Sequence, residues 1–255
     1  MITTLCLIVV ALFVAAACNK PEKVDENEFL YANKVESIHA KIENASQYRN
    51  VAIVKLMVYD RTTNETHGNV NVFTDHYVEI ARGEWKSGGF TIELPKTLDP
   101  NHIRPLIGDI GGNHPTNIYF KQPTMTTSEE NVKVADAYFV GIDKNGNVVA
   151  TFSPLNMVEN GNTKAIFVYV DSDVTISGYI KREGHAIPAH EGAPSWFEVT
   201  TNYSVEWEKG WNVLFLSRTH LATGFTMITT EQWASTFVSG LRWYGSEENL
   251  HMFQN

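Results

Sequence analysis

The chain carries one loop in which histidine and glutamate side chains lie close enough in sequence to suggest metal chemistry. His185, His190 and Glu191 all fall in the Gly/Pro/Ala-rich segment EGHAIPAHEGAP. A zinc site needs three or four ligands held by oriented neighbours, and this spacing is not HExxH and puts no two imidazoles on one helix face. A third ligand would have to come from a distant part of the sequence. We therefore interpret the segment as an exposed loop, and predict no metal and no cofactor.

Acidic side chains are numerous, but none has the spacing of a hydrolytic site. Glu198 and Glu206 share the polar face of one predicted strand, roughly 26 Å apart at about 3.3 Å per residue. Glycoside hydrolysis uses carboxyl groups about 5–10 Å apart. The run DKNGN at 143–147 begins like a calcium loop, but Val148 and Pro154 replace the required Gly and Glu, so it predicts a turn. With no nucleophile elbow and no P-loop, enzymatic activity has no sequence support.

The aromatic residues give a more specific hypothesis. The chain has 6 Trp, 10 Tyr and 13 Phe, more than core filling requires. Exposed aromatic rings on a surface protein can stack on the apolar faces of sugars. Trp207 and Trp211 fall on the apolar side of predicted strands, which favours the core for both. The candidates for exposure, and hence for ligand contact, lie at strand ends or beside loops: Trp85, Trp196, Trp243 and Tyr244.

The N-terminal segment predicts export. Residues 1–17 contain no charge and form an apolar run followed by small residues, as in a cleaved signal peptide. The run is shorter than the about 20 apolar residues that span a membrane. Ala15-x-Ala17 suits the ordinary signal peptidase. Ala15-Ala16-Ala17-Cys18 also resembles the bacterial lipobox, and this resemblance implies that Cys18 is lipidated and becomes the new N-terminus. Three acyl chains would follow, and two already give stable anchoring.

Residues 18–34 then comprise the lipidated cysteine and an acidic tether. The tether is polar and contains Pro21, which favours a flexible segment. Its acidic run resembles the export signal of lipoproteins displayed on the outer face of certain Gram-negative bacteria. A solvated linker is the alternative reading. We therefore expect an outer-membrane, lipid-anchored protein that contacts the membrane through Cys18, with surface display left open.

Composition limits the class of partner. The formal net charge is −9, which argues against nucleic acid because phosphates would be repelled. Cys18 is the only cysteine after the apolar segment, so packing and hydrogen bonds must hold an exported domain without disulfides. The length is ample for a sizeable core in one or two domains.

Strand patterns dominate the chain from residue 35 onward. Residues 51–59 are almost continuously apolar, as in a strand buried on both faces. Residues 197–207 alternate cleanly between apolar and polar, as in an antiparallel strand with one solvated face, and Lys209-Gly210 turns the chain into a second apolar strand. Pro100 predicts a short helix, and a second one is predicted at 230–238 with Thr229 as N-cap.

These patterns predict an all-β, mostly antiparallel fold with one or two short helices. The long irregular connection from about 97 to 132 suggests a boundary between a first β unit at 35–130 and a second at 131–255. The two units form either two sandwich-like bodies or one large sandwich or barrel.

Three segments resemble a group of uncharacterised β-rich Gram-negative surface lipoproteins: DSDVTISGYI at 171–180, WEKGWNVLFLS at 207–217 and SGLRWY at 239–244. The motifs are structural, and the resemblance implies no activity. Taken together, the sequence favours an exported lipid-anchored envelope protein acting as a non-enzymatic binding module for a glycan or protein ligand. A hydrolase of extracellular polymers and a structural envelope protein without a small ligand are the two alternatives.

Overall fold

The structure is a computed structural model, and it describes residues 35–60, 66–67, 70–71, 76–106, 118–121, 124–158, 160–185, 196–223, 226–236, 238–248 and 250. The strands in chain order are β1 (Ser37–Lys41), β2 (Val51–Asp60), β3 (Thr66–His67), β4 (Val70–Asn71), β5 (His76–Lys86), β6 (Gly89–Glu93), β7 (Arg104–Pro105), β8 (Ile118–Lys121), β9 (Thr126–Thr127), β10 (Lys133–Asp136), β11 (Tyr138–Asp143), β12 (Val148–Val158), β13 (Gly161–Val170), β14 (Val174–His185), β15 (Trp196–Trp207), β16 (Gly210–Thr223), β17 (Thr226–Ala234) and β18 (Arg242–Ser246). Two 3-10 turns accompany them, η2 (Ala45–Gln47) and η3 (Pro100–His102).

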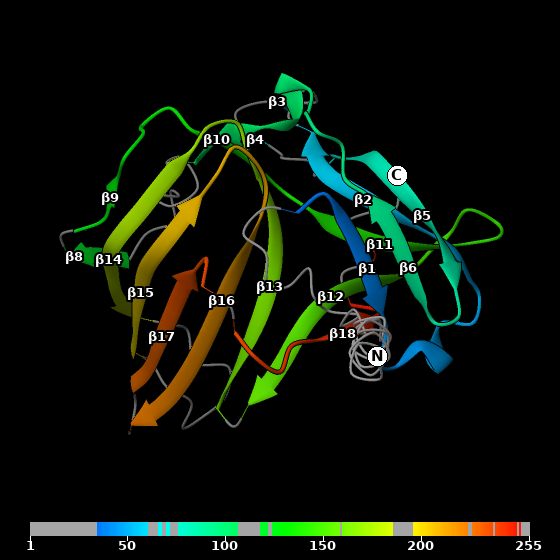
Figure 1. The fold of residues 1–255 in the computed structure, drawn as a ribbon. Coiled ribbons are helices and arrows are strands. Elements are labelled where there is room, and N and C mark those ends of the chain that lie inside the picture. The colour runs from blue at the N-terminus through cyan, green and yellow to red at the C-terminus, as the bar shows by residue number, and fades with distance from the viewer. Residues whose placement is uncertain are drawn as a thin grey trace, which may run out of the picture.

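Nearly all of these strands belong to one connected, mostly antiparallel sheet. Its main order is β1-β6-β5-β2-β11-β12-β13-β16-β17-β15-β14-β8, with β7, β9, β10 and β18 attached beside this path. Figure 1 shows β14, β15, β17, β16 and β13 across one half of the molecule and β2, β5, β6 and β1 across the other. The sheet is not closed into a barrel, and the all-β prediction is confirmed.

The sheet has two main cores, which lie on opposite faces of its central strands. One face of β13 and β16 contributes Phe167, Tyr169 and Phe215 to a first core, which β1, β2, β5, β6 and β11 cover from the other side. The opposite face contributes Val168 and Leu214 to a second core beneath β14 and β15. These two central strands are therefore buried on both faces, because each face supports a different core.

Several local predictions are confirmed. The almost continuously apolar run at 51–59 forms β2, and the alternating run at 197–207 forms β15. The proline-initiated helix is η3, where the Asp99 carboxylate accepts a hydrogen bond from the Asn101 N–H at 2.9 Å. In the β11–β12 turn, Asp143 Oδ1 accepts from the backbone N–H groups of Asn145 and Asn147 at 2.8 and 2.9 Å. This is the turn that the DKNGN run predicts.

The helix predicted at 230–238 is wrong, because most of that segment belongs to strand β17. Thr229 and Glu231 are buried while Thr230 and Gln232 are exposed, which is the two-residue period of a strand. β17 lies between β15, which it pairs with in parallel, and β16, which it pairs with antiparallel. β15 and β16 therefore do not pair with each other, although a tight turn joins them.

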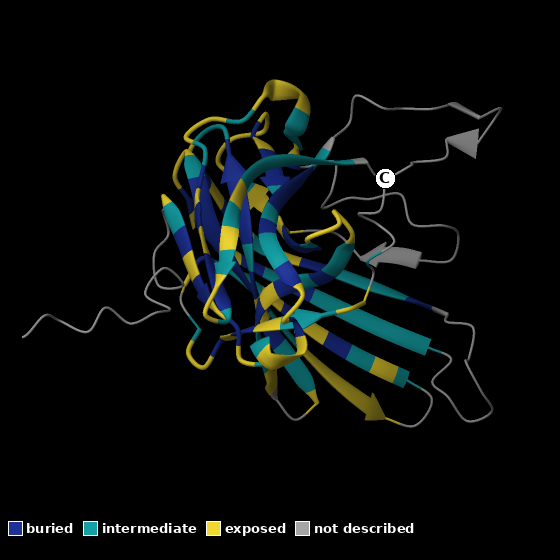
Figure 2. Ribbon diagram, turned by 90° about the vertical axis from the view of Figure 1, so that its right-hand side faces the viewer, coloured by how far each residue is buried: buried dark blue, intermediate teal, exposed yellow. Residues whose placement is uncertain are grey.

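Burial decreases along β16 and increases along β13 and β15, so one end of these strands is buried and the other is open. β16 is buried from Trp211 to Leu216 and exposed from Thr219 onward. Figure 2 shows strands changing in this way from dark blue to teal and yellow. Among the described residues, no helix has both the length and the apolar character needed to cross a bilayer. The boundary between units at 130 and 131 stays a prediction, since β13 and β16 serve both cores.

Candidate functional site

A cavity opens where the β12–β13 hairpin splays apart. The two strands pair only from Leu155–Val158 to Gly161–Lys164. Beyond that point β12 pairs with β11, and β13 pairs with β10. The chain passes from β10 to β11 inside the opening, where the Ala137 N–H donates to the Phe167 carbonyl at 2.9 Å. Three strand segments therefore surround a gap that no continuous ladder fills.

The gap holds a cavity of about 360 Å³. Phe139, Phe152 and Phe167 border it, but each is at most 3% exposed and packs into the first core, so they offer no ring for stacking. Its polar side chains are Asp136, Tyr138, Thr151, Ser153, Lys164 and Glu248. The volume falls in the range of about 300–1,000 Å³ that small-molecule sites occupy. The cavity thus combines a partly apolar lining with several hydrogen-bonding groups.

The charged groups around the cavity are partly paired. Arg104 Nη2 lies 2.6 Å from Asp136 Oδ2, so this carboxylate is engaged by a cation. Burial, followed by the neighbouring charge of Asp136, raises the pKa of Tyr138, and its hydroxyl stays neutral at physiological pH. Partial burial, followed by Arg218, lowers the pKa of Lys164, while Asp136 and Glu231 act in the opposite direction.

Tyr244, one of the predicted ligand residues, lies beside this cavity. It stands directly opposite Ser153 in the β12–β18 ladder, and directly opposed side chains share a face. Tyr244 is 39% exposed and Tyr138 is 36% exposed. Two accessible phenol rings therefore accompany the polar cavity, one from β11 and one from β18.

The structure places the predicted tryptophans elsewhere. The expected exposure of Trp243 is wrong, because it is fully buried in the first core and stacks on Phe167 at 5.9 Å. Successive strand residues point to opposite faces, so Trp243 and Tyr244 must differ. Trp85 is partly buried and stacks on Phe152 at 5.2 Å, and partly buried Trp196 begins β15 in the other half of the sheet.

The remaining predicted site residues cannot be placed. Cys18, His190 and Glu191 lie outside the described residues, as does the side chain of His185, whose backbone ends β14. Within the described ranges, no group of three His, Cys, Asp or Glu residues is arranged to hold a metal ion.

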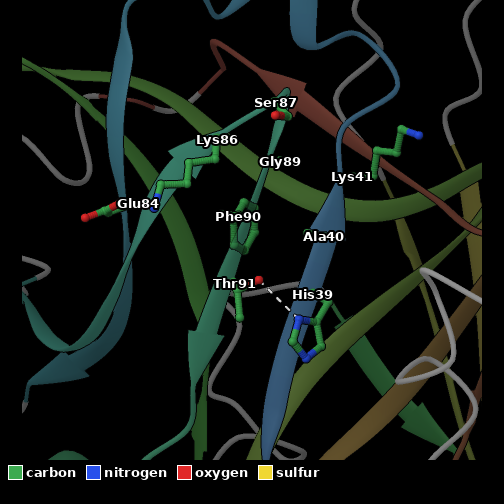
Figure 3. Close-up of a pocket in the computed structure, with 9 residues that line it drawn as sticks. All are labelled: His39, Ala40, Lys41, Glu84, Lys86, Ser87, Gly89, Phe90 and Thr91. Atoms are coloured by element: carbon green, nitrogen blue, oxygen red, sulfur yellow. Dashed lines mark hydrogen bonds and ion pairs between the residues drawn. The ribbon is translucent and has the colours of Figure 1, made fainter. Parts of the chain in front are cut away.

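A second concavity, a groove of about 650 Å³, lies on the outer face of β1, β6 and β5 (Figure 3). Lys41 and Lys86 both stand opposite Gly89 in the flanking ladders, and all three residues line the groove. A Cβ on Gly89 would lie 2.1 Å from the Ala40 carbonyl oxygen, so only glycine fits. Its one aromatic lining residue, Phe90, is 4% exposed, so this groove offers no ring for stacking.

A serine–histidine contact also occurs at this groove. Ser37 Oγ lies 3.2 Å from His39 Nε2, and His39 Nδ1 lies 3.1 Å from Thr91 Oγ1 (Figure 3 draws the second contact). A nucleophilic serine needs a base that a carboxylate orients and stabilises in its charged form, and here the third group is a hydroxyl. We interpret the contact as a surface hydrogen-bond chain.

Comparisons of the chain with protein-family models, with curated proteins and with solved structures find no match. The site must therefore be judged from its geometry. Sequence reasoning missed Asp136, Tyr138 and Lys164, which the β10–β13 and β12–β13 registers bring together. Tyr138 begins β11, but no motif in the sequence marks it as a site residue.

Proposed function

We propose that this protein is an exported, lipid-anchored envelope protein whose β domain is a non-enzymatic glycan-binding module. The observation that carries the proposal is the cavity at the β12–β13 splay. It offers the accessible ring of Tyr138 and several hydroxyl and charged groups within one concavity, and the accessible ring of Tyr244 stands beside it, opposite Ser153.

Sugars fit such a site because they present both hydroxyl groups and apolar C–H faces. Tyr138 supplies a neutral hydroxyl and a ring, and Ser153 and Lys164 supply further polar groups. Tyrosine suits this role because its ring is apolar while its hydroxyl forms hydrogen bonds. The outer groove lacks an accessible ring, so it supports glycan stacking less well.

Glycan binding is tested with full-length protein in detergent, screened against an oligosaccharide array and then titrated by calorimetry. Tyr138→Ala and Tyr244→Ala should each weaken binding about fivefold, which corresponds to about 1 kcal/mol for a lost ring contact. Tyr179→Ala is the matched control, because Tyr179 is 44% exposed on β14, far along the sheet order from β12. No glycan bound, or equal losses in all three variants, would contradict the proposal.

The hydrolase alternative rests on one observation, that Asp136 and Glu248 line the same cavity. Binding is favoured because Asp136 is held by Arg104 at 2.6 Å, which leaves it poorly placed to transfer a proton. Reducing-end release from the bound glycan, measured for the natural chain and for Asp136→Asn and Glu248→Gln, decides between them. Release that both variants abolish would establish the hydrolase instead.

The proposed attachment to the membrane rests on the lipobox-like segment before Cys18. Palmitate labelling in cells should report the natural chain and should vanish in Cys18→Ala. Cys6→Ala, which changes the chain's other cysteine, should keep the label. Labelling that persists in Cys18→Ala would refute the anchor.

A further inference from the structure

The hairpin end of β13 and the facing part of β16 place two cations side by side. Asn162 stands opposite Arg218, and Lys164 stands opposite Leu216 two residues further on. Residues two apart on a strand share a face, so Asn162, Lys164 and Arg218 all project from the same side of the sheet. Like charges at neighbouring cross-strand positions destabilise a sheet unless something compensates them.

One carboxylate, Glu231, lies beside this group, but its oxygens are already engaged. Glu231 Oε1 accepts from Nε and Nη2 of Arg218 at 2.9 and 2.6 Å. Its Oε2 accepts from Thr201 Oγ1 at 2.9 Å and lies 3.8 Å from Arg182 Nη2. The Glu231 side chain is only 8% exposed. The Glu231 carboxylate therefore fixes the position of the Arg218 guanidinium.

Lys164 remains without an ion-pair partner among the described residues, and its side chain reaches solvent. Arg218 is 41% exposed and presents the guanidinium edge that Glu231 does not use. Lys164, Arg182 and Arg218 lie near the carboxylate of Glu231, and the other nearby carboxylate, Asp136, is already engaged by a fourth cation, Arg104, at 2.6 Å. This local excess of positive charge stands out in a chain whose formal net charge is −9.

We propose that this surface is a binding site for an oxyanion, a carboxylate or a phosphate group, held between Lys164 and Arg218. The Lys164 ammonium and the free edge of the Arg218 guanidinium supply charge-assisted hydrogen bonds, and the Asn162 amide lies within the same surface. Glu231 and Arg182 are positioning residues. The site shares Lys164 with the cavity of the glycan proposal and goes beyond that proposal, because Arg218 and Asn162 do not line the cavity and can hold an oxyanion without a glycan.

The indole N–H of Trp233 serves as the spectroscopic probe of ion binding at this site. Trp233 lies two residues after Glu231 on β17 and stands opposite Leu216, which in turn faces Lys164. In an indole ¹H–¹⁵N spectrum of the full-length protein, Trp233→Phe identifies its signal. The signal is then followed while inorganic phosphate, acetate or chloride is added at constant ionic strength.

Phosphate, acetate or both should shift this signal saturably, whereas chloride should not, and the active anion identifies the preferred group. Lys164→Met, at an exposed position that the fold tolerates, should weaken saturation at least about tenfold. Lys86→Met, a cation of the outer groove, should change nothing. Equal shifts with chloride, or unchanged saturation in Lys164→Met, would overturn the proposal. A negative oligosaccharide screen would leave this result standing.

Discussion

The two faces of β13 and β16 carry different kinds of side chain. One face contributes Phe167 and Phe215 to the first core. The other begins in the second core with Val168 and Leu214, and ends in the charged group around Lys164 and Arg218. The stability of the apolar face depends on buried area and shape complementarity. The stability of the charged face depends on which carboxylate oxygen pairs with which guanidinium nitrogen. The same two strands therefore carry one face whose stability depends on packing and another whose stability depends on specific charge pairs.

The largest effect is expected on the apolar face. Trp243 is fully buried, and its ring lies 5.4 Å from Phe90, 5.2 Å from Phe139 and 5.9 Å from Phe167. Trp243→Ala should lower the free energy of unfolding by about 3–5 kcal/mol, measured by urea denaturation. Trp196→Ala, at a partly exposed strand start, should cost much less. Similar losses at both positions would show that the first core does not dominate stability.

An intermediate effect is expected from Glu231→Gln on the charged face. Removing this carboxylate leaves Arg182 and Arg218 without their shared partner, which should cost about 3 kcal/mol. Glu84→Gln is the matched control, because the exposed Glu84–Lys86 pair should contribute no more than about 1 kcal/mol. If Glu231→Gln is as mild as the control, the charged face does not depend on this pairing.

The smallest effect at neutral pH, and the most pH-dependent one, is expected from Tyr203→Phe. Burial raises the pKa of Tyr203 to about 12, with Arg182 acting against the shift and Glu231 adding to it. The folded state therefore favours the neutral phenol. This stabilisation is complete below pH of about 10 and is lost at roughly 1.4 kcal/mol per pH unit as pH rises toward 12.

Tyr203→Phe should flatten that alkaline decline while changing stability at pH 7 by about 1 kcal/mol. Urea unfolding at stepped alkaline pH, with phenolate absorbance recorded in parallel, measures both quantities. Titration of Tyr203 together with exposed tyrosines near their ordinary pKa would contradict the burial argument.

The fold class was accessible from sequence because hydrophobic periodicity is local. The alternation at 197–207 and the apolar run at 51–59 each appear within a single strand, and both became strands at those places. The segment at 230–238 was wrongly predicted to be helical because Thr229 followed by Gln232 also matches a helix N-terminus. Its strand character comes from pairing with β15 and β16 on either side, which no local pattern contains.

The candidate site was much less accessible. Tyr244 was correctly expected to be accessible, yet Trp243 next to it is buried. Successive residues of a strand point to opposite faces of the sheet, so a shift of one position exchanges the buried and the exposed side chain. The cavity residues Asp136 and Lys164 come from strands whose registers meet only in the folded sheet. Neither residue type is unusual, so no motif marks them. Their role follows from pairing geometry alone.

The position of β17 also has a consequence for the order in which the sheet assembles. β15 and β16 are consecutive and joined by a tight turn, so they reach each other before β17 exists as a partner. A direct β15–β16 hairpin would be the more local pairing, but in the native sheet β17 lies between the two strands. The central ladder of the second half therefore depends on contacts between residues about 30 positions apart, such as Trp196 and Thr226, and contacts of that separation form more slowly than those of a simple hairpin.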